Sequence, residues 1–111
     1  MPIEGGSTSG YVKGWNKFTA AGNGEAVQLV RRGDFNVSIW AAPGGTFTGT
    51  VVPERSFDYG ATWLPFTFSD GVAVSWSAPI STVLPEPQLG IYWRLRVPTL
   101  TNGEINWQIS Q

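Results

Sequence analysis

Alternation of apolar and polar residues with a period of two is the feature that most constrains the fold of this chain. Ile105, Trp107 and Ile109 alternate with polar residues, and residues 91–97 and 35–41 show the same pattern. Successive side chains of a β-strand point to opposite faces, so this pattern predicts half-buried strands. No window of a dozen residues carries an apolar stripe of helical period. We therefore expect an all-β chain.

Clusters of glycine, proline, asparagine and aspartate separate these segments about every 8–12 residues, as in all-β domains. Gly22-Asn23-Gly24 predicts a hairpin between residues 17–21 and 25–31, because these residues tolerate positive φ. Further turns are expected at residues 32–34, 43–45, 58–60, 70–71 and 102–103.

Prolines limit how two segments of the chain can pair in a sheet. Pro53, within the segment 46–55, indicates an edge strand or a bulge, because proline lacks the N–H that a ladder needs. Residues 79–87 contain three prolines, and we expect this segment to cross between sheets without pairing throughout.

About eight short strands with these turns favour a single antiparallel β-sandwich of jelly-roll type. A chain of 111 residues suits one domain, which we place at residues 11–111. Residues 1–10, MPIEGGSTSG, are rich in Gly and Ser and predict a flexible N-terminal arm. Ile3 could anchor such an arm on a neighbouring subunit.

The chain has neither cysteine nor histidine, which excludes disulfides, thiolate metal sites and the commonest general base. The net charge of −1 comes from thinly scattered charges without a basic stripe, so we expect no nucleic-acid partner. No run of 18 apolar residues and no signal-like N-terminal segment occurs. We expect no membrane partner and synthesis in the cytoplasm.

The sharpest local motif is an Asp-box, formed by Ser56, Asp58, Gly60, Thr62 and Trp63. In sialidases and other β-propellers this motif forms a turn that lies away from the active site. Here its spacing predicts a hairpin in which the aspartate accepts hydrogen bonds from turn N–H groups and the glycine takes positive φ. We interpret the motif as a structural turn and carry over no glycosidase activity.

No other pattern predicts catalysis. Among the eight acidic residues, Glu54 and Asp58 are the only close strand-borne pair, and the turn accounts for Asp58. No glycine-rich loop precedes a helix, and Arg32-Gly33-Asp34 is interpreted as a β-turn. We therefore expect no enzyme activity, no cofactor and no metal.

Exposed aromatic and arginine side chains are the remaining candidates. Tyr92, Arg94 and Arg96 share one face of a strand whose other face is apolar, and Tyr, Trp and Arg are enriched at binding hot spots. Trp40 falls on the polar side of its strand, and Trp15 lies near the arm. These five residues, together with Ile3 in the arm, are our candidate interface, with a merely solvated sheet surface as the alternative.

The second half of the chain resembles a family. Glu54-Arg55-Ser56-Phe57-Asp58 leads to Thr62-Trp63, followed by Gly90-Ile91-Tyr92-Trp93-Arg94-Leu95 and the terminal Ile109-Ser110-Gln111. These phrases, over roughly residues 50–111, resemble short virion proteins of tailed phages, in which a final hairpin ends near the C-terminus. Together with the length and the all-β pattern, they resemble the small capsid staple proteins of epsilon15-like podoviruses.

The resemblance implies a jelly-roll subunit on the outer surface of an icosahedral phage head. Such a subunit pairs with itself, as a homodimer, and clamps adjacent major capsid proteins. Two alternatives remain open. One is a tail or baseplate accessory module, and the other is a carbohydrate-binding sandwich, since Trp and Tyr rings stack on sugars. Glycan contact is not our first expectation.

Overall fold

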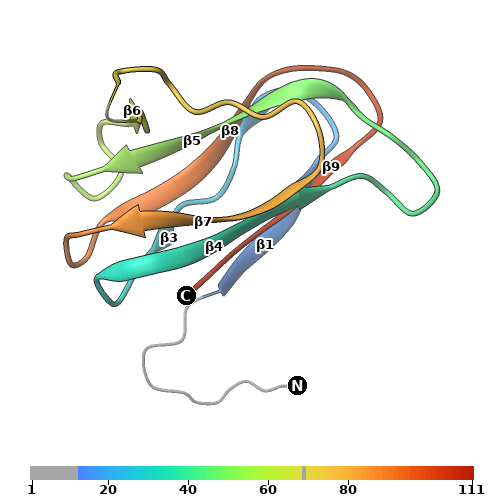
Figure 1. Ribbon diagram of the computed structural model, residues 1–111. Coiled ribbons are helices and arrows are strands. Elements are labelled where there is room, and N and C mark those ends of the chain that lie inside the picture. The colour runs from blue at the N-terminus through green and yellow to red at the C-terminus, as the bar shows by residue number, and fades with distance from the viewer. Residues whose placement is uncertain (1–12, 69) are drawn as a thin grey trace.

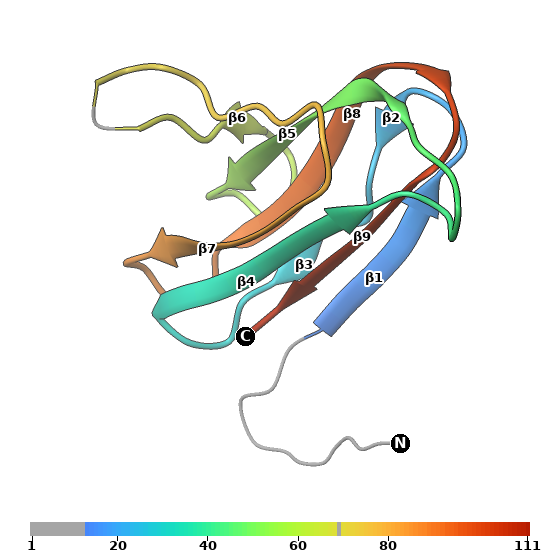
Figure 2. The same ribbon diagram turned by 45° about the vertical axis from the view of Figure 1, so that its right-hand side comes forward.

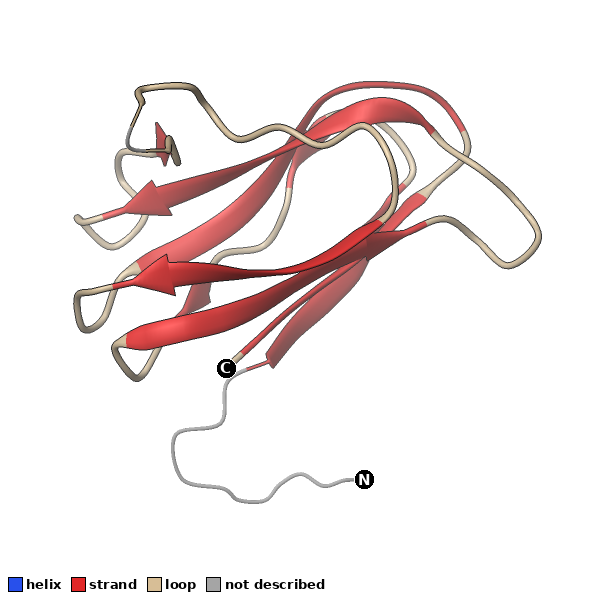
Figure 3. Cartoon of the chain, in the orientation of Figure 1, coloured by secondary structure: helices blue, strands red, loops and turns tan. Residues whose placement is uncertain are grey.

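The computed structural model describes residues 13–68 and 70–111. Over these two ranges the chain forms nine strands in two antiparallel sheets, without a helix (Figure 3). The predicted arm at residues 1–10, including Ile3, lies outside the described residues.

The strands pack as two layers, which Figure 1 shows nearly edge-on. In chain order they are β1 (Lys13–Phe18), β2 (Gly22–Asn23), β3 (Val27–Gln28), β4 (Gly33–Trp40), β5 (Thr48–Ser56), β6 (Leu64–Pro65), β7 (Ile80–Glu86), β8 (Tyr92–Asn102) and β9 (Ile105–Ser110). The first sheet has the order β1-β9-β4-β7, and the second has the order β2-β8-β5-β6, with β3 also paired to β8. Strands that alternate between two sheets in this order form a jelly roll, so the predicted fold is confirmed.

The core lies between the two sheets and is filled by the apolar side of each alternating strand. Its largest fully buried side chains are Trp93 on β8 and Trp107 on β9, each 1% exposed. Phe35 on β4 packs against Trp93 with ring centroids 4.6 Å apart. The alternation of β4, β8 and β9 therefore predicted their buried faces correctly.

The last two strands do not form the hairpin that the resemblance implied. β8 and β9 are separated by only two residues, yet they belong to different sheets. Gly103, with a φ of 79°, turns the chain over the end of the core. β9 then enters between β1 and β4 (Figure 2).

The hairpin predicted at Gly22-Asn23-Gly24 is also wrong. The chain leaves the first sheet at Phe18 and crosses to the second, where Gly22 and Asn23 themselves pair with β8. The backbone N–H of Gly24 donates to the Leu95 carbonyl at 2.7 Å. A Cβ atom on Gly24 would lie 2.8 Å from that oxygen. This glycine therefore permits a close approach to β8 rather than a hairpin turn.

The prolines of residues 79–87 do not prevent pairing, contrary to our expectation. β7 pairs with β4 at seven successive positions, from Ile80 to Glu86. This strand is the edge of its sheet, where a missing N–H can face outward without breaking a ladder. Of the three prolines, Pro79 and Pro87 flank the strand, and Pro85 pairs with Asp34 near its end.

Pro53 lies in β5, which is interior, between β8 and β6. The edge alternative is therefore wrong, and the bulge alternative is supported by a register shift between Thr50 and Val52. The Pro53 carbonyl still accepts a hydrogen bond from the Phe66 N–H at 3.0 Å. The return strand of the Asp-box turn is short, and β6 pairs with β5 only at Leu64 and Pro65.

Candidate binding faces

The candidate interface residues lie on the two opposite outer faces of the sandwich. Trp15 on β1 and Trp40 on β4 point away from the core on the sheet β1-β9-β4-β7 and are 67% and 39% exposed. Tyr92, Arg94 and Arg96 point outward from β8 on the other sheet. We call these two surfaces the tryptophan face and the arginine face. The sequence predicted outward side chains for the other four residues, but neither the orientation of Trp15 nor the division between two faces.

The tryptophan face carries amides between its two indoles. Trp15 pairs with Gln108 and Trp40 pairs with Asn106, both on the intervening strand β9 (Figure 2). Cross-strand neighbours have Cβ atoms about 4.5–5.5 Å apart, so each indole has an amide beside it. In such an arrangement the indole can pack on an apolar group of a partner while the amide beside it hydrogen-bonds a neighbouring polar group.

The arginine face is organised by Glu54, which we had considered only as half of an acid pair. Its two carboxylate oxygens accept hydrogen bonds from Arg94 Nε and Arg96 Nε, each at 2.8 Å. Glu54 is 5% exposed, although it lies on the outward side of β5 opposite Arg94. The two guanidinium groups therefore cover the carboxylate that fixes them.

Aromatic rings surround this ion cluster. The guanidinium of Arg94 lies 4.4 Å from the ring centroid of Trp63, which is within cation–π range. Tyr92 meets Tyr59 edge-to-face with centroids 6.2 Å apart. The Asp-box turn thus supplies two rings, Trp63 and Tyr59, to the same face as the arginines.

The Asp-box forms the turn that its spacing predicted. The Asp58 carboxylate accepts hydrogen bonds from the Thr62 N–H and the Ser56 hydroxyl, both at 2.8 Å. The N–H of Gly60, whose φ is 89°, donates to the Ser56 hydroxyl at 2.8 Å. The Thr62 hydrogen bond, followed by that of Ser56, lowers the pKa of Asp58 below its ordinary value of 3.8. Both of these hydrogen bonds to the Asp58 carboxylate come from residues of the turn itself.

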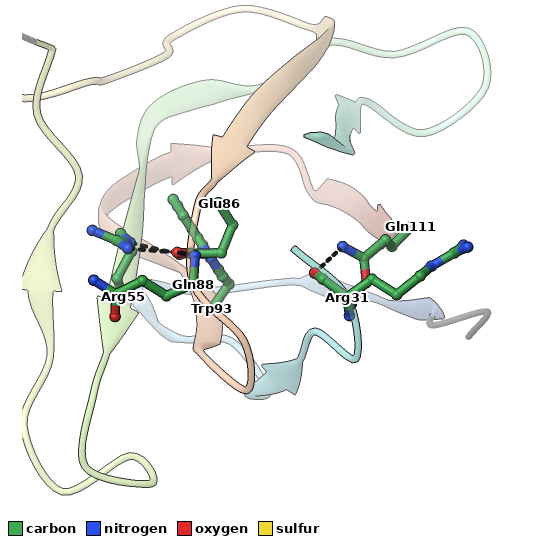
Figure 4. Close-up of polar contacts among 6 residues, drawn as sticks. All are labelled: Arg31, Arg55, Glu86, Gln88, Trp93 and Gln111. Carbon is green, nitrogen blue, oxygen red and sulfur yellow. Dashed lines mark hydrogen bonds and ion pairs between the residues drawn. The ribbon is translucent and has the colours of Figure 1, made fainter. Parts of the chain in front are cut away.

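A second ion pair lies inside the edge of the sandwich. Glu86 on β7 is fully buried, and its carboxylate accepts hydrogen bonds from Nε and Nη2 of Arg55, at 2.8 and 2.7 Å (Figure 4). The same carboxylate accepts the Trp93 indole N–H at 3.0 Å and the Gln88 backbone N–H at 3.0 Å. Four donors thus saturate it, which is how a buried carboxylate avoids an uncompensated charge.

A cavity of about 350 Å³ adjoins this ion pair. It is lined by Gly33, Asp34, Arg55, Phe66, Pro85, Glu86 and Pro87. The charged side chains of this lining include Arg55 and Glu86, the ion pair that links the two sheets. Elsewhere, the side chain of Gln111, just after β9, holds Arg31 (Figure 4). Its Oε1 accepts the Arg31 backbone N–H at 3.1 Å, and its Nε2 donates to the Arg31 carbonyl at 2.6 Å.

Residues 13–68 and 70–111 contain neither a cluster of metal ligands nor a helix that could span a membrane. No group of three or more His, Cys, Asp or Glu side chains there could hold a metal ion. No helix in that part of the chain is long and apolar enough to span a membrane. Comparisons with protein families, with curated proteins and with solved structures found no match for this chain.

Proposed function

We propose that this protein is a non-enzymatic virion protein that decorates and staples the outside of an icosahedral phage head. In this proposal it binds major capsid protein subunits and a second copy of itself. The observation that supports it best is the placement of exposed anchors on both outer faces of one rigid body, with Trp15 on one side and Arg96 on the other. The resemblance of residues 50–111 to capsid staple proteins supplies the location.

A staple must hold two neighbours at a fixed separation. Two packed sheets lie about 10 Å apart, so the two faces of this sandwich are held in a defined relation. The Arg55–Glu86 pair adds a direct link between the sheets. Without cysteine, attachment rests on noncovalent contacts, and a specific interface buries about 800 Å² on each partner.

The test is to mix the purified protein with phage heads that lack it, and to measure attachment by co-sedimentation and electron microscopy. We expect saturable attachment of the native protein at repeated sites. Trp15→Ala with Trp40→Ala should impair one contact, and Arg96→Ala the other. Leu89→Ala changes a 61% exposed apolar side chain in a loop and is the matched control. Absence of attachment by the native protein would contradict the proposal.

The tryptophan face also favours a second candidate function, carbohydrate binding. Indole rings stack on sugars, and the amides of Asn106 and Gln108 stand beside Trp40 and Trp15 to bind hydroxyl groups. A carbohydrate-binding module would show a glycan-dependent change in tryptophan fluorescence, abolished by Trp15→Ala, and no affinity for heads. Attachment to tails but not to heads would instead favour a tail or baseplate accessory module.

A further inference from the structure

The two arginine–carboxylate clusters differ in how much of each guanidinium they use. Arg55 donates hydrogen bonds from both Nε and Nη2 to Glu86, which is buried inside the sandwich. Arg94 and Arg96 each give only Nε to Glu54, on an outer face. In the first cluster four donors occupy the carboxylate, whereas in the second each arginine has both terminal nitrogens without a hydrogen bond to a described residue.

The free donors can be counted from the chemistry of the side chain. A guanidinium group has five N–H donors, of which Nε carries one. Within residues 13–68 and 70–111, the only hydrogen bonds of the Arg94 and Arg96 side chains are those to Glu54. Among the described residues, therefore, the four N–H groups on the terminal nitrogens of each arginine have no hydrogen-bond partner.

The two arginines are held in place before any partner arrives. Glu54 joins them through its two oxygens, and the ring of Trp63 lies 4.4 Å from the Arg94 guanidinium carbon. Their side chains are 17% and 38% exposed, so both are partly covered yet accessible. A pre-organised donor loses less entropy on binding than a free surface arginine.

The charge of the cluster defines what it would bind. Two guanidinium groups and one carboxylate leave one net positive charge, which a single carboxylate neutralises. Terminal guanidinium nitrogens match the two oxygens of a carboxylate in a planar, bidentate geometry. Nucleic acid is disfavoured, because its affinity depends on many phosphate contacts and the chain as a whole carries −1.

We propose that Arg94 and Arg96, braced by Glu54, form a carboxylate-binding site that takes an Asp or Glu side chain of a partner protein. That the partner is a protein rests on the proposed function. Tyr92 and Tyr59, which pack edge-to-face beside the site, would contact the residues that flank the bound carboxylate.

The test uses the arginine Nε–H signals of ¹⁵N-labelled protein in NMR spectra. The probe is a blocked pentapeptide with two Asp residues, and its control is the same peptide with Asn in their place. We expect the Asp peptide to shift the Arg94 and Arg96 signals, and the Arg55 signal to stay constant. The shifts should vanish in about 1 M NaCl, where the Debye length is about 3 Å.

Arg96→Gln should weaken binding of the Asp peptide by about tenfold, because a charged donor pair is lost. It leaves the Arg94–Glu54 pair intact, and an unchanged amide spectrum would show that the fold is kept. Arg96→Lys, a milder change, provides a second variant. Equal shifts with the Asn peptide, or no shift at millimolar concentrations, would overturn the site. Because no phage head is used, this result is independent of the proposed head attachment.

Discussion

The Arg55 guanidinium on β5 and the Glu86 carboxylate on β7 join the two sheets through two parallel hydrogen bonds of 2.8 and 2.7 Å. The pair is bidentate, and the Arg55 guanidinium also lies 4.7 Å from the Phe57 ring centroid. Glu86 is fully buried and the Arg55 side chain is 20% exposed, so salt screens the pair less than it would an exposed pair. This contact fixes one edge of the sandwich, between two strands of different sheets.

Arg55→Leu should destabilise the protein by about 3–5 kcal/mol, because it leaves the Glu86 carboxylate buried without its cation. Replacing both residues with leucine should recover much of this loss, since apolar pairs often substitute well for buried ion pairs. Urea unfolding monitored by circular dichroism measures both. Lys17→Ala is the control, because its 3.5 Å pair with Glu104 is exposed and contributes about 1 kcal/mol or less. If the Arg55 variant unfolded with the same free energy as the Lys17 variant, the interpretation would be refuted.

Trp107→Ala should cost about 3–5 kcal/mol of unfolding free energy, because it opens a large cavity in the core. Trp107 is 1% exposed and lies in β9, between β1 and β4. Trp15→Ala removes the same kind of side chain from an exposed position, and we expect a change within about 0.5 kcal/mol. Thermal and urea melts compare the two. Similar melts for the two variants would show that the core assignment is wrong.

The Asp-box turn should weaken in acid. The hydrogen bonds of Thr62 and Ser56 lower the folded-state pKa of Asp58 below 3.8, so the ionised carboxylate stabilises the fold above that pH. This contribution is lost as pH falls through the lower folded-state value. Side-chain NMR titration of Asp58 measures that pKa directly. Asp58→Asn should remove this component of the acid sensitivity, and a midpoint at or above 3.8 in the native protein would contradict it.

Gly103→Ala should destabilise the protein more than Gly71→Ala. Both glycines have positive φ, at 79° and 85°, so alanine costs backbone strain of about 1 kcal/mol at each. A Cβ atom on Gly103 would also collide with the Thr46 carbonyl oxygen, whereas one on Gly71 meets nothing within 4 Å. Denaturant unfolding gives the free energy of unfolding of each variant, and the difference between the two measures the cost of the collision. Equal losses would mean that the crossover between β8 and β9 tolerates a side chain.

The arrangement of charges was beyond sequence-based prediction. Arg55 and Glu86 are 31 residues apart, and Glu54 and Arg94 are 40 apart. The sequence did offer one signal for the first pair. Leu84 and Glu86 are two residues apart on β7, so an inward Leu84 implies an inward Glu86. The three prolines of residues 79–87 hid this signal, because they favour a crossing segment that does not pair throughout.

Local chemistry determined the strands β4, β8 and β9, which side of each is buried and where the Asp-box turns. Those properties depend on the alternation of side chains along one strand and on hydrogen bonds within a few residues, as at Ser56 and Asp58. Tertiary structure decided which sheet each strand joins, as when β8 and β9 separate after Gly103. Backbone hydrogen bonds are offered by every strand alike, so the choice of partner depends on how the whole core packs. The division of Trp15 and Arg96 between two opposite faces follows from that choice.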